Sequence, residues 1–196
     1  MALMNLKNED LSGYTLIIPS ISVANVPQLT IDLSITTYNF RKVTTIWHPA
    51  IVPSIGVDPY QTNQDEICTA CELYVNKELK LAAIQLRSAI ETKLALTNEQ
   101  IDNLMEVNGI KPLELTIGGK YSITGGGFAL KLFEILHEEL RCTLLVKYVS
   151  EGDNRPDALT MLEKVFAISG LHDTNSIVFP SSWDFVFGGP PPIGIY

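Results

Sequence analysis

The sequence predicts an α/β fold in a single domain, and three observations lead to that prediction. A β-rich run, a helical run and a second β-rich run follow one another within residues 13–47. Two further β-rich runs on either side of Asn76-Lys77-Glu78 are typical of a hairpin. Helical and β-like segments then alternate to about residue 168, which is the pattern of helices packed on a sheet.

The N-terminal elements are justified by composition and by helix-start signals. Residues 13–18 are predicted to form a short buried strand that Pro19 ends. Asn25 is expected to cap a helix that has Pro27 in its first turn, where a missing N–H costs little. Residues 41–47 contain β-branched residues and a tryptophan, which predicts the next strand. The order strand, helix, strand favours a parallel βαβ unit.

The middle of the chain is predicted to hold the hairpin. A proline-containing loop at 48–64 precedes its strands at 67–75 and 79–86. The second strand lacks polar alternation, so we expect it to be buried on both faces. Helical segments over 88–108, with a capping-box pattern, and a short hairpin over 113–123 are predicted to follow.

The C-terminal elements are a predicted helix at 128–140 with an apolar stripe, a buried strand at 143–149 and a last helix at 156–168. The final segment, 188–196, contains three prolines and three glycines. Such a segment forms neither a helix nor a central strand. We therefore expect a domain of residues 1–187 followed by a flexible tail.

Composition and charge exclude several function classes. Of the 196 residues, 46% are hydrophobic and 18% are charged, so a core can form without a disulfide or a metal. The 22 acidic and 14 basic residues give a net charge of −8. An acidic chain without a basic cluster is a poor ligand for nucleic acid or an anionic membrane surface. No apolar run approaches the ~18 residues of a membrane span. We therefore expect neither nucleic acid nor a membrane as a partner.

The expected location is the cytoplasm and the nucleus. The first ten residues lack the apolar region of a signal peptide. The chain has three cysteines, and an odd number suits a reducing compartment better than a secreted disulfide scaffold.

Two motifs, one of cysteines and one of glycines, have features that favour a structural role over a chemical one. Cys68 and Cys71 have the spacing of a redox pair or half a metal site, but residues three apart in a strand point to opposite faces. Gly125 to Gly127 precede a helix, where an anion can bind. No Lys-Ser/Thr pair follows them, so a backbone conformation that only glycine allows is the favoured interpretation.

An acidic cluster is the remaining candidate for chemistry. Glu151, Asp153 and Asp157 could perform acid–base work, or hold a cation together with Asn154. A solvated turn and favourable charge at a helix start explain them more simply. We therefore expect no catalytic residue, no bound metal and no cofactor.

The apolar tail is the strongest candidate for a functional segment. Exposed apolar groups usually indicate a partner, and a proline-rich segment loses little entropy when it docks. A terminal carboxylate beside an aromatic residue is a common handle for capture. The candidate docking residues are Ile193, Gly194, Ile195 and Tyr196. That the tail packs back on its own domain is an equally open alternative.

Five blocks of sequence, in a fixed order, resemble one known family. They are Gly13 to Leu29, Ile84 to Ser88, Gly125 to Gly127, Leu145 to Leu159, and Pro180 to Trp183 with the Gly/Pro tail. In these blocks the chain resembles the proteasome assembly chaperone 2 family. The resemblance implies a three-layer α/β fold with a mixed sheet flanked by helices and a role that is not enzymatic. It also implies a heterodimer with proteasome assembly chaperone 1 that helps to build the α-ring of the 20S proteasome.

The chain departs from that family at two places. Tails of such chaperones enter pockets between α-subunits with a tyrosine next to last, whereas Tyr196 is the last residue. The stretch from about Glu91 to Leu113 is shorter than the family's usual middle. The alternatives are a phosphate-binding enzyme of a nucleoside-phosphorylase-like fold, with Gly125 to Gly127 as its phosphate site, and a truncated isoform without function.

Overall fold

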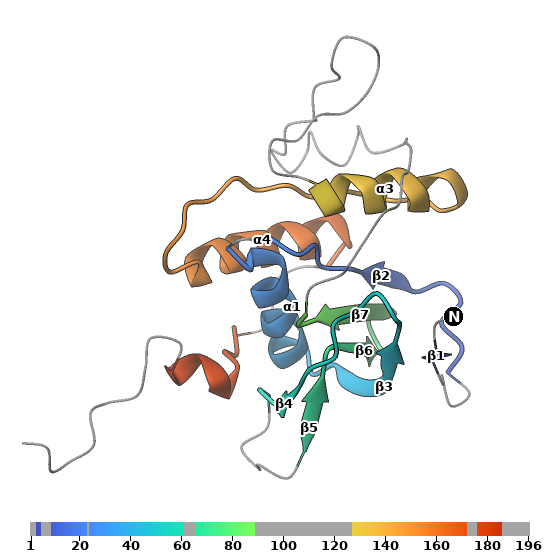
Figure 1. Cartoon of the computed structure of the whole chain (residues 1–196). Coiled ribbons are helices and arrows are strands. Elements are labelled where there is room, and N and C mark those ends of the chain that lie inside the picture. Colours follow the sequence, from blue (N-terminus) through green and yellow to red (C-terminus); the bar gives the residue numbers. More distant parts are fainter. Residues whose placement is uncertain are drawn as a thin grey trace, which may run out of the picture.

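A five-stranded mixed sheet lies against two stacked helices in the computed structural model of the chain (Figure 1). The structure describes residues 3–4, 9–22, 24–60, 66–88, 127–171 and 176–185. Its elements are β1 (Leu3–Met4), β2 (Thr15–Ile17), α1 (Val26–Thr37), β3 (Arg41–Trp47), β4 (Ile55–Val57), β5 (Ile67–Thr69), β6 (Cys71–Asn76), β7 (Leu81–Leu86), α3 (Gly127–Glu139), α4 (Arg155–Ile168) and the 3₁₀ helix η1 (Ser181–Phe185).

The strands of the main sheet lie in the order β1-β3-β6-β7-β2. β7 is parallel to β2 and antiparallel to β6, and β6 is antiparallel to β3. β2 and β3 therefore run in the same direction, as predicted for the N-terminal βαβ unit, but β6 and β7 lie between them. The expected α/β class with a mixed sheet is confirmed.

β6 and β7 form the predicted hairpin at the centre of the sheet. Asn76 pairs with Leu81 at its closed end, where Asn76 Oδ1 accepts a hydrogen bond from the Leu79 amide at 2.9 Å. Ala82 and Ala83 of β7 are 1% and 0% exposed. Side chains at successive strand positions point to opposite faces, so β7 is buried on both faces, as predicted.

α1 begins where the sequence predicts a helix. Asn25 occupies the N-cap position with φ of 52°, although its side chain makes no capping hydrogen bond, and Pro27 lies in the first turn. Ile31 and Leu33 are both buried, although residues two apart point to different sides of a helix. Both sides are covered because α1 contacts the sheet through β7 and contacts α4 as well.

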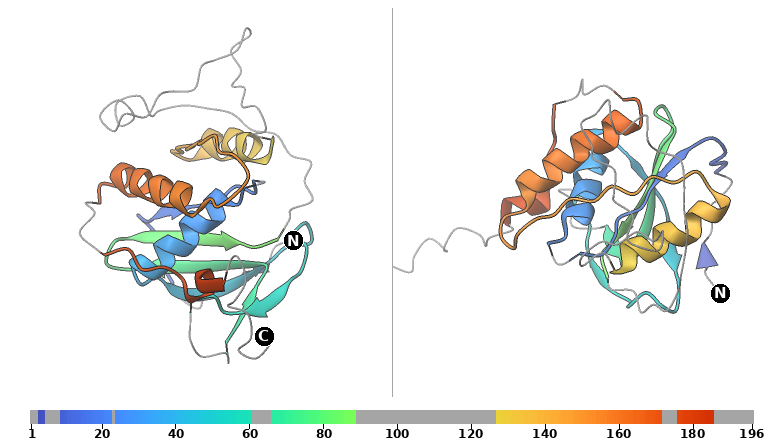
Figure 2. Two further views of the ribbon diagram at one scale, coloured as in Figure 1. Left: turned by 90° about the vertical axis from the view of Figure 1, so that its left-hand side faces the viewer. Right: turned by 90° about the horizontal axis from the view of Figure 1, so that it is seen from above.

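α4 supplies the outer layer of the main core. Ala158, Leu162 and Phe166 recur every four residues and are buried on one stripe of the helix. Tyr38, at the end of α1, stacks on Phe166 with ring centroids 4.0 Å apart. The sheet, α1 and α4 thus form successive layers, which are visible in Figure 1 and in the left view of Figure 2.

The first predicted strand is an edge strand and not a buried one. In the described part of the chain β2 pairs only with β7, and the Leu16 side chain is 48% exposed. A short apolar run is compatible with either position, because its composition does not report how many neighbours it has.

The predicted strand at 143–149 is wrong. Residues 141–150 adopt no regular secondary structure, and Tyr148 is 68% exposed. An extended segment becomes a strand only when a neighbouring strand pairs with its backbone, and among the described residues the sheet ends at β2. The preceding helix forms as α3, yet no side chain between residues 129 and 139 is fully buried.

The loop expected at 48–64 contains a strand that the sequence did not indicate. β4 pairs antiparallel with β5, with Gly56 opposite Cys68. Its three residues include a glycine, which weakens the strand signal. The run predicted as one strand at 67–75 is divided at Ala70, because β5 pairs with β4 whereas β6 pairs with β3 and β7.

The elements predicted between residues 89 and 126 and the tail at 188–196 lie outside the described residues. None of the helices within the described ranges is long and apolar enough to cross a membrane.

Candidate functional site

The four predicted docking residues, Ile193 to Tyr196, lie outside the described residues, but the segment that leads to them is described. Residues 176–185 return to the domain and end in η1. Trp183 is 4% exposed and belongs to the main core cluster together with Phe166. The described segment before the tail, residues 176–185, is therefore part of the folded domain.

Hydrogen bonds fix both ends of this segment. At the end of α1, Thr37 Oγ1 accepts a hydrogen bond from the Val178 amide at 3.1 Å. In the loop between β4 and β5, the Pro59 carbonyl accepts hydrogen bonds from Ser181 Oγ at 3.1 Å and from the Ser182 amide at 3.4 Å. The described segment 176–185 is thus held between the end of α1 and this loop.

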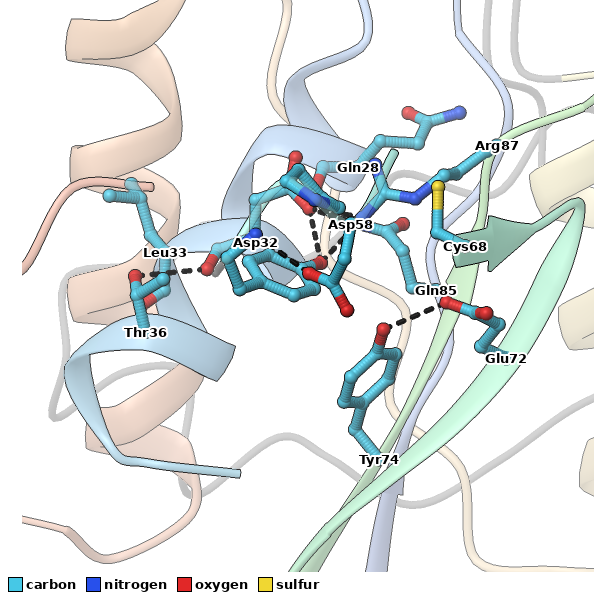
Figure 3. A network of polar contacts seen from close by, with 12 residues as sticks. Gln28, Asp32, Leu33, Thr36, Asp58, Cys68, Glu72, Tyr74, Gln85 and Arg87 are labelled. Carbon is cyan, nitrogen blue, oxygen red and sulfur yellow. Dashed lines mark hydrogen bonds and ion pairs between the residues drawn. The ribbon is translucent and has the colours of Figure 1, made fainter. Parts of the chain in front are cut away.

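The loop that receives η1 is held by a buried polar network on α1 and β7 (Figure 3). Asp32 Oδ1 accepts hydrogen bonds from the Tyr60 hydroxyl, from Gln85 Nε2 at 2.6 Å and from an Arg87 guanidinium nitrogen at 3.0 Å. Arg87 also donates to the Tyr60 hydroxyl at 2.7 Å. The Tyr60 amide donates to Asp58 Oδ1 at 2.8 Å, so Tyr60 is held through both its backbone and its side chain.

The electrostatics of this network favour a structural role. Burial and the Asp32 carboxylate raise the pKa of Tyr60 well above its usual value. Burial alone would lower the pKa of Arg87. The combined effect of Tyr60 and Asp32 is upward and larger, so the pKa of Arg87 lies above its usual value. At neutral pH the phenol keeps its proton and the guanidinium keeps its charge. Such a network holds α1, the loop and β7 together and is poorly suited to transferring a proton.

A second buried carboxylate adjoins the first. Glu72 on β6 is fully buried and accepts hydrogen bonds from the Tyr74 hydroxyl at 2.8 Å and the Thr69 amide at 2.9 Å, and it forms an ion pair with Lys42. Burial and Glu72 raise the pKa of Tyr74. The rings of Tyr74 and Tyr60 meet edge to face with centroids 5.5 Å apart, so the two clusters are contiguous.

Sequence reasoning missed both carboxylates. Asp32 and Glu72 are each the only charged residue of a segment that is otherwise apolar or uncharged, and that is the signal that could have identified them. A charge inside a core segment needs a buried partner. The partners themselves, Tyr60 and Arg87 for Asp32, lie 28 and 55 residues away, where no local pattern connects them.

The two cysteines of the CxxC motif are free, buried thiols. Cys68 lies in β5 and Cys71 in β6, so the expectation that they point to opposite faces of one strand is wrong. The interpretation that the motif has a structural role is nevertheless supported. Burial, followed by the neighbouring Glu72, raises the pKa of Cys71 to about 11, and burial also raises the pKa of Cys68. Both remain protonated at neutral pH, whereas metal binding and redox chemistry use the thiolate. Among the described residues, no group of three or more histidines, cysteines or carboxylates could hold a metal.

The buried thiol and phenols predict a loss of stability at alkaline pH. Their pKa values are higher in the folded protein than in the unfolded chain, so the unfolded chain loses these protons at a lower pH. The stability that the protonated groups contribute is therefore complete only below the usual thiol pKa of 9.0, and it is lost as the pH rises. We expect the free energy of unfolding to fall as the pH rises from 9 toward 11. Urea titrations at fixed pH would measure it, and Cys71→Ala should weaken the dependence. A free energy that stays constant over this range would contradict the assignment.

The acidic cluster is engaged in ordinary ion pairs. Asp157 pairs with Lys147 at 2.9 Å, and Asp153 pairs with Arg155 at 2.8 Å. With Glu151 they border an open hollow of about 510 Å³. The simpler of the two interpretations of this cluster is supported. Of the glycine triplet only Gly127 lies within the described residues, where it begins α3.

Proteins named proteasome assembly chaperone 2 are similar to this chain. The one from Xenopus tropicalis is 30% identical over an alignment of 252 positions, gaps included, which covers 94% of this chain and 95% of that protein. The one from Homo sapiens is 28% identical over 255 residues, which cover 93% and 95%. A third, from Nematostella vectensis, is 34% identical over 91 residues, which cover 44% and 37%. No family model matches the chain.

The alignment also shows a difference in length. The stretch aligned with the Xenopus tropicalis protein is longer than the 196 residues of this chain, so that relative has residues that this chain lacks. The similarity nevertheless covers 94% of the chain and 95% of that relative, with 30% identity. The chain belongs to the proteasome assembly chaperone 2 family.

Proposed function

We propose that the chain is a non-enzymatic chaperone that assists assembly of the α-ring of the 20S proteasome, as half of a heterodimer with proteasome assembly chaperone 1. The observation that carries the proposal is the similarity, over 94% of the chain, to a protein named proteasome assembly chaperone 2. The proposed location is the cytoplasm and the nucleus, where the free thiols of Cys68, Cys71 and Cys142 would stay reduced.

The use of charge in the described residues supports a chaperone role. The carboxylates of Asp32, Glu72, Asp153 and Asp157 each pair with a cation of the same chain. These pairs connect elements of the fold. The large apolar side chains that remain exposed suit a protein partner better than a small polar substrate.

The C-terminal segment supports a docking role for the tail. We propose that residues 1–187 form the domain and that residues 188–196 are a flexible tail whose last four residues, Ile193 to Tyr196, dock on the α-ring. The eleven residues that follow η1, 186–196, span at most about 40 Å when extended. Because η1 is anchored, a docking pocket must lie within roughly that distance of its end.

Co-expression with proteasome assembly chaperone 1, followed by binding to purified 20S α-subunits, tests the proposal. We expect higher solubility and a higher melting temperature with the partner, because binding to the folded state stabilises it, and retention of α-subunits by the complex. A stable monomer that gains nothing from co-expression and binds no α-subunit would contradict it. Thermal stabilisation by phosphate and nucleosides would instead support the phosphorylase-like alternative.

Deleting Gly194 to Tyr196 is expected to weaken α-ring binding about ten- to a hundredfold. Burial of Ile195 and Tyr196 contributes roughly 1.5–3 kcal/mol each before entropy losses. Titration of the purified complex with α-subunits measures the change. Heterodimer formation serves as the control and should be unaffected. Equal ring affinity with and without these residues would place the contact on the folded domain.

A further inference from the structure

The two-stranded sheet of β4 and β5 directs its large apolar side chains outward. Val57 lies opposite Ile67, and Ile55, two residues before Val57, points to the same face. The exposed fractions of Ile55, Val57 and Ile67 are 71%, 60% and 59%. These three side chains form a continuous β-branched surface, which we call the ribbon face.

The opposite face of this small sheet holds its smallest residues. Gly56 lies opposite Cys68, which is buried, and Cys68 Sγ donates to the Val57 carbonyl at 3.3 Å. A Cβ on Gly56 would lie 3.6 Å from Cys68 Sγ. The arrangement reverses the usual one, in which the apolar side chains of a half-covered sheet face the core. The ribbon face is therefore an apolar surface without an internal partner among the described residues.

The ribbon face is also held in place. The Asp58 amide donates to the Glu66 carbonyl at 3.0 Å, and Lys42 Nζ donates to the Ile67 carbonyl at 2.9 Å. Asp58 itself is 5% exposed. A surface fixed in this way loses little entropy when a partner binds.

β4 offers backbone groups beside these side chains. It has β5 as its one neighbour in the described part of the chain, and a two-stranded sheet is marginally stable without further cover. Asp58 and Glu66 form a hydrogen-bonded pair, so the alternate positions on β4, Val57 and Ile55, direct their N–H groups away from β5. An extended strand with apolar residues on one face would match both the N–H groups and the side chains.

We propose that the ribbon face is the docking site of an apolar β-strand of the partner subunit, which adds to the free edge of β4 and covers Ile55, Val57 and Ile67. The inference rests on the proposed function, since it assigns a surface to that heterodimer. The occupant is a subunit of a lasting complex because such interfaces are the more apolar ones, and the ribbon face carries no charged side chain.

The position of the ribbon face has a consequence for the tail. Pro59, two residues after Val57, accepts the hydrogen bonds of Ser181 and Ser182 in η1, and Figure 1 shows η1, in red, near β4. A partner strand on β4 would therefore border η1, the last described element before the tail.

The test is co-purification of tagged proteasome assembly chaperone 1 with variants of this chain. Val57→Asp and Ile55→Asp are expected to reduce the recovered partner at least tenfold, because each places a charge in an apolar interface. Leu16→Asp is the matched control, since Leu16 is exposed on another edge strand, and should bind as wild type. Ile55→Thr keeps the β-branched shape that suits a strand, so it is not expected to disturb folding. It should reduce the recovered partner less than Ile55→Asp does. Hydrogen exchange at the Ile55 and Val57 amides should slow in the complex.

Each outcome bears on a different part of the proposal. If the wild-type chain and Val57→Asp bind the partner equally, the ribbon face is not the contact, although the heterodimer stands. If the wild-type chain binds no partner, the heterodimer and its contact both fail. If sedimentation shows a homodimer of the wild-type chain that Val57→Asp dissociates, a second copy is the occupant and the assignment to a partner subunit is overturned.

Discussion

Replacing Asp32 with alanine is expected to lower the free energy of unfolding by about 3 kcal/mol, the lower end of the range for breaking a buried ion pair. The substitution removes the acceptor that Tyr60, Gln85 and Arg87 share. The Arg87 side chain is 22% exposed, so water can solvate only part of the charge that is left unpaired. Guanidinium chloride unfolding at neutral pH measures the change.

A surface ion pair provides the matched control. Asp157 pairs with Lys147 at 2.9 Å, but both side chains are about 30% exposed, so Asp157→Ala is expected to cost less than about 1 kcal/mol. Asp32→Asn keeps the shape and one acceptor oxygen and should lie between the two variants. Equal stabilities of Asp32→Ala and Asp157→Ala would show that the network around Asp32 contributes little to the fold.

The same substitution should affect the C-terminal segment. Tyr60 follows Pro59, whose carbonyl receives η1, and Asp32 fixes the Tyr60 hydroxyl. Loss of that contact frees the loop and with it one of the two anchors of the segment. The buried network therefore connects core stability to the position of the proposed docking tail.

Elements with strong local signals could be predicted from the sequence. The helix predicted at 156–168 is observed as Arg155–Ile168, and the hairpin strand predicted at 79–86 is observed as Leu81–Leu86. A helical stripe and a turn between two apolar runs are properties of neighbouring residues, so one segment carries the whole signal.

Features that depend on distant neighbours could not be predicted. Residues 143–149 have the composition of a strand, but a strand also requires an adjacent strand, which the described part of the sheet does not provide. Nor does the sequence show that Asp32 and Arg87 meet, or that Ile55 and Val57 face outward while Gly56 faces inward. The resemblance to a family indicated a function but identified neither the buried network nor the ribbon face.

Replacing Trp183 with alanine is expected to lower the free energy of unfolding by about 3–5 kcal/mol, the cost of truncating a large aromatic side chain in a core. Trp183 is 4% exposed and lies in the main cluster with Tyr38 and Phe166. Phe179, whose ring centroid is 5.8 Å from that of Trp183, is 50% exposed. Phe179→Ala is thus a matched control of the same segment and should cost about 1 kcal/mol or less.

The functional effect of Trp183→Ala separates docking from anchoring. Without the indole, residues 176–185 keep a few hydrogen bonds and the smaller apolar contacts of Ile177 and Pro180. Limited proteolysis should therefore cleave this segment more readily in the variant than in Phe179→Ala. The tail residues Ile193 to Tyr196 are unchanged, yet their effective concentration at the α-ring falls when their starting point is mobile. We therefore expect the folded variant, measured well below its melting temperature, to bind the α-ring more weakly than Phe179→Ala does. Equal ring affinity of the two variants would mean that the tail docks without needing an anchored origin.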